Sequence, residues 1–191
     1  MLMRELILAS ASPRRRELLA AAGFSFKICN ANVIENEDPD GDPQKAVADN
    51  ARAKALAVAQ KNPNAVVLGA DTTVAVGKRV LNKPADMNEA VKMLKELSGK
   101  THTVYTGFCI VCGQRKLLRE EIVACNVTFK QIDDATIARY FERVNPLDKA
   151  GAYGIQESRE LIIESYDEPL SNIIGLPIEI VKEILEEELQ K

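Results

Sequence analysis

The pattern of apolar and polar positions divides the first half of the chain into alternating strand-like and helix-like segments. Short apolar runs over 5–10, 24–31 and 65–77 have the composition of buried strands. Between them lie a segment over 12–23, which opens with Ser-Pro and closes with Gly, and an alanine-rich segment over 43–61. Both carry the signals of helices. This half therefore predicts strands that alternate with helices.

Consecutive strands are expected in the second half. The segments 101–113 and 117–132 have strand character and are joined by a short polar turn. Helices are expected before them, capped by Asp86, and after them, starting at Asp133 or Asp134. A further β region precedes a C-terminal helix that opens at Pro177 and carries apolar residues on one side, namely Ile178, Val181, Ile184, Leu185 and Leu189. The whole pattern predicts an α/β fold with a mixed twisted sheet and flanking helices.

Length, composition and charge limit the classes of protein to which this chain can belong. The chain has 191 residues, of which 46% are hydrophobic and 28% charged, so we expect one domain over 1–191. The net charge of −3 argues against a nucleic-acid partner, which would require a basic face. No apolar run approaches the ~20 residues that span a bilayer, and the N-terminal run is too short for a signal peptide. We therefore expect a cytoplasmic protein without a membrane partner.

The cysteines and the single histidine do not predict a metal site. Cys109 and Cys112 form a CxxC pair, but in a strand their side chains point to opposite faces. Neither a second CxxC nor a histidine pair completes a zinc site. We expect buried structural cysteines, and we place His102 at the surface or at a strand edge.

Positive charge is concentrated directly after the first predicted strand. Ser10 ends that strand, and Arg14 and Arg15 lie in the first turn of the following helix. Cations there oppose the helix dipole, whereas the same residues facing a phosphate would add charge-assisted hydrogen bonds. The stretch lacks the glycine-rich loop of a Walker motif. A solvated basic face and an anion site both remain open.

Three further positions place charge where it needs an explanation. Asp71 lies in an apolar strand that Gly69-Ala70-Asp71 is expected to interrupt, and a buried carboxylate requires a partner. A general base, a ligand for a hard cation, and a turn or cap are the alternatives. Lys54 lies among alanines and Lys83 precedes Pro84. Each lysine alone is as expected on a solvated surface.

The segment 148–156, DKAGAYGIQ, combines two closely spaced glycines with Gln156. Glycines allow a backbone to approach a flat ligand closely, and a glutamine amide can both donate to and accept from the edge of a base. An ordinary glycine-containing loop before a strand explains the segment equally well.

Together these stretches resemble the Maf family of nucleotide pyrophosphatases. The motifs occur in the family's order and spacing from residue 8 to about 177, and they are SASPRRRELL, NARAKA, GADT, NKP, LSGKTHTVYTG, DKAGAYGIQ and NIIGLP. The resemblance implies an inosine triphosphatase-like fold with two lobes around a central cleft. It also implies action on nucleoside triphosphates with a divalent cation, Mg²⁺ or Mn²⁺, a house-cleaning role, and a homodimer.

The resemblance also implies roles for individual residues. Asp71 matches the family's proton acceptor, and Arg14, Thr72 and Gln156 match positions linked to substrate choice. Thr72 together with AYGIQ resembles the branch that acts on dTTP and UTP. The positions that match polar groups around the triphosphate and metal are Ser10, Arg14, Arg15, Glu35, Lys54 and Lys83. The chain departs from the family pattern at Glu168-Pro169, where a Gly-Ser pair is common.

The expected reaction is hydrolysis at the α-phosphorus of dTTP, UTP or modified pyrimidine nucleotides, which yields a monophosphate and pyrophosphate. Asp71 and Glu35 would hold the cation, and Asp71 would activate water. The charge that develops on the phosphoryl oxygens and on the leaving pyrophosphate would be neutralised by Arg14, Arg15, Lys54 and Lys83. Two alternatives stay open. One is a nucleotide-sensing module in growth or division control without turnover, and the other is a pyrophosphatase for inosine or 7-methylguanosine triphosphate.

Overall fold

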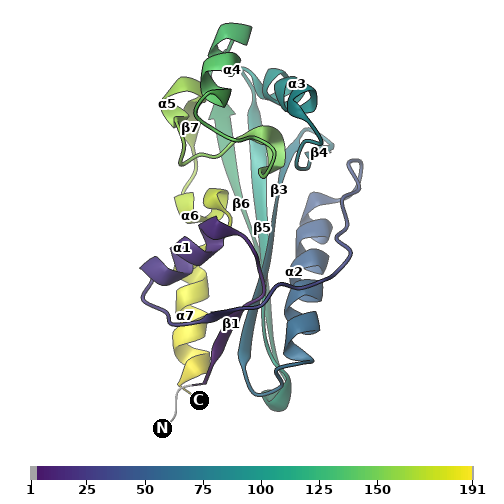
Figure 1. The fold of residues 1–191 in the computed structure, drawn as a ribbon, viewed down its shortest axis with the longest axis vertical. Coiled ribbons are helices and arrows are strands. Elements are labelled where there is room, and N and C mark those ends of the chain that lie inside the picture. The colour runs from purple at the N-terminus through teal and green to yellow at the C-terminus, as the bar shows by residue number, and fades with distance from the viewer. Residues whose placement is uncertain (1–3, 191) are drawn as a thin grey trace.

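The computed structural model describes residues 4–190 and contains a seven-stranded mixed sheet with helices on both faces (Figure 1). The strand order is β2-β1-β3-β5-β6-β7, and β4 pairs with β3. β1 is parallel to β2 and β3, and the remaining pairs are antiparallel. The strands are β1 (Leu6–Leu8), β2 (Lys27–Ile28), β3 (Val66–Val76), β4 (Arg79–Leu81), β5 (Thr101–Cys112), β6 (Leu117–Phe129) and β7 (Ile163–Tyr166). The predicted mixed α/β fold is confirmed.

The helices largely follow the predicted signals. Asp42, Asp86 and Asp133 cap three of them with their carboxylates. Ser12 is the N-cap of α1, although its side chain makes no capping hydrogen bond. The helices are α1 (Pro13–Ala21), α2 (Pro43–Ala59), α3 (Met87–Leu97), α4 (Asp134–Phe141), α5 (Arg159–Ile162), α6 (Leu170–Ile174) and α7 (Ile178–Leu189), with 3₁₀ turns η1 (Gly113–Arg115) and η2 (Ala150–Ala152). The predicted apolar side of α7 packs on the sheet.

Three long strands, β3, β5 and β6, run through two lobes of the molecule (Figure 1). In the lower lobe, α1 and α7 cover one face of the sheet and α2 covers the other. In the upper lobe a separate core contains residues of α3, α4, α6 and η2. The two lobes therefore share one sheet.

β3 is continuous where the sequence predicted an interruption at Gly69-Ala70-Asp71, and that prediction is wrong. All three residues pair with β5. Gly69 is required for a different reason, because a Cβ atom there would lie 2.4 Å from the carbonyl oxygen of Ala51 on α2. The glycine lets α2 pack directly against the strand, and this close approach brings side chains of α2 within reach of Asp71.

The cysteines are free thiols, and Cys109, Cys112 and Cys125 are buried, as predicted for structural residues. Cys109 packs in the core beneath α2, whereas Cys112 packs in the core beneath α1 and α7. The two sulfur atoms therefore lie on opposite faces of the sheet. This arrangement confirms that the CxxC pair is not a joint metal or redox site.

His102 is buried, so its predicted place at the surface or a strand edge is wrong. Only 2% of the residue is exposed, and Nε2 lies 2.7 Å from the hydroxyl oxygen of Tyr153. Its ring also makes an edge contact with Phe129, at 5.1 Å between ring centres. Burial lowers the pKa of His102 to about 4, which keeps the ring neutral at pH 7. Sequence patterning missed this because a neutral, hydrogen-bonded imidazole can occupy an aromatic core.

Candidate active site

The candidate site lies beside the part of β3 that has no paired strand on one edge. β1 pairs with β3 only as far as Leu68, and β4 pairs with it only from Val74 onward. In the described part of the chain, residues 70–73 thus have no strand beside them on this edge. A cavity of about 360 Å³ opens there. It is lined by every predicted site residue, namely Ser10, Arg14, Arg15, Glu35, Lys54, Asp71, Thr72, Lys83 and Gln156.

On the face of β3 that meets α2, the carboxylate of Asp71 is held by two side chains of the helix. Lys54 donates from Nζ to Oδ1 of Asp71 at 2.8 Å, and Asn50 donates from Nδ2 to Oδ2 at 2.9 Å. Lys54 also donates to Oε2 of Glu35 at 2.7 Å. Lys54 is only 7% exposed. The buried cation therefore has two carboxylates as partners, which offsets the cost of its desolvation.

Asn50 is a site residue that sequence reasoning missed. Besides Asp71, its amide donates to the backbone oxygen of Asn36 at 3.1 Å and accepts from the backbone nitrogen of Asn36 at 2.7 Å. Asn36 follows Glu35, so Asn50 fixes the loop that carries this carboxylate. The available signal was its position four residues before Lys54, which places both side chains on one face of a helix.

On the opposite face of β3, Arg15 fills the space between α1 and the strand. Its guanidinium donates from Nε to the carbonyl oxygen of Gly175 at 2.8 Å, from Nη1 to Oγ of Ser10 at 3.2 Å, and from Nη2 to Oγ1 of Thr72 at 2.9 Å. The hydroxyl of Thr72 lies 2.9 Å from that of Thr106 on β5, which fixes its position. Arg15 thus ties α1, β3 and the end of α6 together.

The charge of Arg15 has no counter-ion in direct contact. Only 8% of Arg15 is exposed, and among residues 4–190 all of its hydrogen-bond acceptors are neutral oxygen atoms. Burial lowers its pKa from the ordinary value, but an arginine in a protein stays protonated. A buried, permanent and unpaired positive charge at a cavity is the arrangement that favours binding of an anion.

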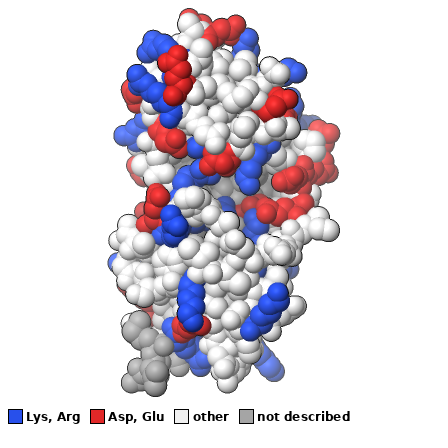
Figure 2. All heavy atoms as spheres, in the orientation of Figure 1, with Lys and Arg blue, Asp and Glu red and all other residues white. Residues whose placement is uncertain are grey.

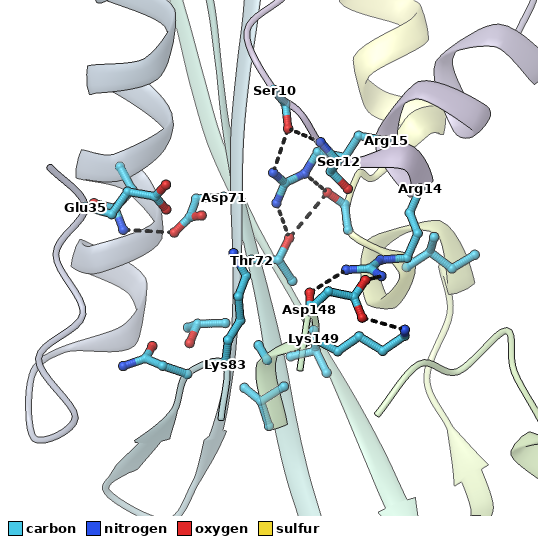
Figure 3. A pocket seen from close by; sticks show the side chains of 18 of the residues that line it. Ser10, Ser12, Arg14, Arg15, Glu35, Asp71, Thr72, Lys83, Asp148 and Lys149 are labelled. Carbon is cyan, nitrogen blue, oxygen red and sulfur yellow. Dashed lines mark hydrogen bonds and ion pairs between the residues drawn. The ribbon is translucent and has the colours of Figure 1, made fainter. Parts of the chain in front are cut away.

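Arg14 reaches across the cavity to the other lobe (Figure 3). Its Nη1 donates to Oδ2 of Asp148 at 2.9 Å, and Nη2 donates to the backbone oxygen of Asp148 at 3.2 Å. Oδ1 of Asp148 accepts from Nζ of Lys149 at 2.9 Å. Burial alone would raise the pKa of Asp148, but the hydrogen bonds from Lys149 and Arg14 lower it overall. The carboxylate is therefore ionised between two cations.

Lys83 and Gln156 line the same cavity from the upper lobe, and both are exposed. Within the described chain neither side chain has a hydrogen-bond or ion-pair partner. The departure at Glu168-Pro169 lies at the start of α6, where Glu168 Oε2 accepts from the backbone nitrogen of Leu170 at 2.7 Å. The cavity is lined instead by the other end of α6, through Ile173–Gly175.

The charges around the cavity are mixed. In Figure 2 the hollow at mid-height is bordered by basic and acidic side chains, whereas the surface below it carries few charges. Within residues 4–190, no group of three or more His, Cys, Asp or Glu side chains is placed to hold a metal ion by itself. None of the helices described is long and apolar enough to cross a membrane.

Comparison with known proteins assigns the chain to a family. The family model described as Maf-like protein matches residues 5–188. The dTTP/UTP pyrophosphatase of Bacillus pumilus is 44% identical over 184 residues, which cover 96% of each chain, and that of Pyrococcus furiosus is 40% identical over 96% of this chain and 95% of its own. A HAM1 protein from Coxiella burnetii shares the fold, with a TM-score of 0.52 at 14% identity over 97% of this chain and 100% of its own. The chain belongs to the Maf family.

Proposed function

We propose that this protein hydrolyses dTTP and UTP at the α-phosphorus to the nucleoside monophosphate and pyrophosphate, as a house-cleaning enzyme of the cytoplasm. The observation that carries the proposal is the convergence of a partly buried carboxylate, Asp71, and the buried cation Arg15, which has no counter-ion in contact within residues 4–190, on one cavity. The two relatives described above bear the name dTTP/UTP pyrophosphatase at 40% identity or more. Their coverage of almost the entire chain supports the same substrate class here.

In the proposed reaction a water molecule attacks the α-phosphorus and transfers its proton to the Asp71 carboxylate. The bond between the α-phosphorus and the bridging oxygen breaks, and pyrophosphate leaves with that oxygen. Lys54 and Asn50 orient Asp71 through their hydrogen bonds at 2.8 and 2.9 Å. Arg15 and Lys83 stabilise the negative charge that develops on the phosphoryl oxygens and the leaving group.

The residues fit a divalent cation that is shared with the substrate. Glu35 and Asp71 both direct a carboxylate oxygen at Nζ of Lys54, at 2.7 and 2.8 Å, so their oxygen atoms already converge on a positive charge. Mg²⁺ is commonly held by one or two carboxylates together with substrate phosphates and water. We therefore assign Glu35 and Asp71 as its protein ligands. Bound there, Mg²⁺ or Mn²⁺ would neutralise phosphate charge and favour water attack.

The test is hydrolysis in ¹⁸O-labelled water with Mg²⁺ and a panel containing dTTP, UTP, ITP, 7-methyl-GTP and ATP. We expect pyrophosphate as the released product, the label in the monophosphate, and the highest kcat/KM for dTTP and UTP. Label in pyrophosphate would place the attack at the β-phosphorus. Preference for ITP or 7-methyl-GTP would contradict the substrate class. Binding without turnover would favour a nucleotide sensor.

The homodimer implied by the family resemblance is part of the same proposal. Light scattering on the purified protein measures it directly, because one chain has a mass of 21.0 kDa. A mass of one chain at the concentrations used for catalysis would contradict the dimer without affecting the proposed reaction.

A further inference from the structure

Lys149, on the loop that leads into η2, is a buried lysine that the proposed mechanism does not use. Its side chain is 6% exposed, although lysine is seldom buried. Nζ donates to the backbone oxygen of Asn145 at 2.8 Å and to Oδ1 of Asp148 at 2.9 Å, and it lies 3.2 Å from Oε1 of Glu157. An ammonium group has three donors. Each donor has an acceptor here, so none is left over for a phosphate group.

The acceptors of Lys149 connect it to two residues of the cavity, and Figure 3 shows the connection through Asp148 to Arg14. Through Asp148, whose second carboxylate oxygen accepts from Arg14 at 2.9 Å, Lys149 is linked to the first turn of α1 in the other lobe. Through Glu157 it is linked to the residue that follows Gln156. Arg14 and Gln156 both line the cavity and come from segments more than a hundred residues apart. Lys149 is thus tied to both.

The geometry of the ion pair between Arg14 and Asp148 is well defined only because the buried Lys149 also contacts Asp148. Side chains of Arg14 and Asp148 are 26% and 49% exposed, and an ion pair so open to water holds a geometry only weakly. A second cation on the other oxygen restricts the carboxylate, because Lys149 is itself fixed by burial. The backbone closes around this lysine, since a Cβ atom at Gly154 would lie 2.8 Å from its Cε. Ala152 adopts a left-handed conformation with φ of 63°, which only a well-packed loop maintains.

We propose that Lys149 is a positioning residue that sets nucleotide selectivity by fixing Arg14, through Asp148, relative to the segment that carries Gln156. The inference rests on the proposed function in taking a nucleoside triphosphate as the ligand. Lys149 itself does not contact the substrate. It fixes Asp148, whose carboxylate orients the Arg14 guanidinium, and it fixes the segment that carries the Gln156 amide. Misplacement of a substrate-positioning group by about 1 Å can reduce catalytic efficiency about a hundredfold.

The test is Lys149→Met, which keeps the length of the side chain and removes its charge and donors. We expect the ratio of kcat/KM for dTTP to that for ITP to fall about tenfold, the effect of losing one well-placed polar contact. The exposed ion-pairing lysine of α7 provides the control, and Lys182→Met should leave the ratio unchanged. In an Arg14→Met background the loss caused by Lys149→Met should be smaller, because the two residues act through one chain of contacts.

Equal losses of kcat/KM for both nucleotides, or the same loss of selectivity with and without Arg14, would overturn the positioning role. If Lys149→Met does not fold, as judged by thermal unfolding, Asp148→Asn interrupts the same chain and should lower the ratio in the same direction. Calorimetric binding of the α,β-imido analogues of dUTP and ATP separates the two proposals. Wild-type protein that binds selectively without turnover contradicts the proposed reaction, whereas unchanged binding selectivity in Lys149→Met contradicts this inference.

Discussion

Two buried cations lie on opposite faces of β3 and border the same cavity. Lys54 is 7% exposed and Arg15 is 8% exposed, so both side chains are largely withdrawn from water. Lys54 contacts two carboxylates, those of Glu35 and Asp71, at 2.7 and 2.8 Å. Arg15 contacts only neutral oxygens, such as the hydroxyl of Thr72. The two cations are thus equally buried, but in the described chain Lys54 has counter-ions in contact and Arg15 has none.

The difference is consistent with the proposal that the phosphate chain binds on the Arg15 face of β3. On the α2 face the positive charge is already balanced, and the carboxylates have hydrogen bonds that orient them for proton transfer or cation binding. On the α1 face the positive charge is unbalanced, and an anion would restore the balance. The comparison therefore supports the proposed roles, with the chemistry on the Asp71 face and anion binding on the Arg15 face. Single substitutions can test it.

The largest effect is expected for Asp71→Asn. The amide keeps the shape of the carboxylate but cannot accept the proton of the attacking water, and loss of a general base reduces kcat by about a thousandfold. Steady-state kinetics with dTTP measures this. Asp134→Asn on α4, where the side chain is 79% exposed, is the control and should retain full activity. Comparable activity of Asp71→Asn and wild type would remove the assignment of the base.

Removal of the balanced cation should damage both stability and activity. Lys54→Met leaves Glu35 and Asp71 without the ammonium that both contact. Breaking a buried pair in this way costs about 3 kcal/mol of unfolding free energy, and the partial exposure of Glu35 keeps the value at the lower end of the range. Urea unfolding in the absence of nucleotide provides the measurement. A stability equal to wild type would show that the pairing contributes little.

Removal of Arg15, the cation that no described counter-ion contacts, should change activity much more than stability. Arg15→Met removes a desolvated charge, which raises the unfolding free energy, but it leaves the carbonyl oxygen of Gly175 without its donor, which lowers it. We expect the unfolding free energy to change by less than about 1 kcal/mol, while KM for dTTP rises about 50-fold through loss of charge-assisted contacts. A large loss of stability in Arg15→Met would mean that its role is structural, and the contrast with Lys54 would disappear.

The sequence predicted the members of the site better than their contacts. Apolar periodicity and capping signals located α1, α2, α3, α4 and α7, because these depend on local chemistry. Family motifs contain all of the predicted residues that line the cavity except Glu35. Neither source indicated that Arg15 is unpaired whereas Lys54 is paired. That difference depends on which side of β3 each helix covers, which is a tertiary property.

The missed residues have a similar physical reason. Asn50 and Lys149 have partners outside their own helix or turn, such as the backbone of Asn36 and the carboxylate of Glu157. A polar residue in an alanine-rich helix or a glycine-containing loop looks solvated until its partner is known. His102 was misplaced for the related reason that burial depends on a partner, the hydroxyl of Tyr153, that the local pattern does not reveal.

His102 sharpens the comparison because it is a further buried base that, like Arg15, has a neutral partner, but unlike Arg15 it can release its proton. Burial lowers its pKa from 6.5 to about 4 in the folded protein. Between these values the unfolded chain binds a proton that the folded chain excludes, so stability rises with pH across this window and is complete above it. The unfolding free energy should therefore be about 2 kcal/mol lower at pH 5 than at pH 7 through this one residue.

His102→Gln can still hydrogen-bond to the Tyr153 hydroxyl but does not titrate, so this part of the pH dependence should vanish. The chain has no other histidine, and the carboxylates contribute equally in both proteins. Urea unfolding at the two pH values, followed by circular dichroism because the chain has no tryptophan, gives the difference. Identical pH dependence in wild type and His102→Gln would mean that water reaches the ring and that its charge is tolerated. Burial beside a neutral partner would then be insufficient to keep the His102 ring unprotonated. By the same reasoning, burial of the Arg15 charge would cost less unfolding free energy than its low exposure indicates.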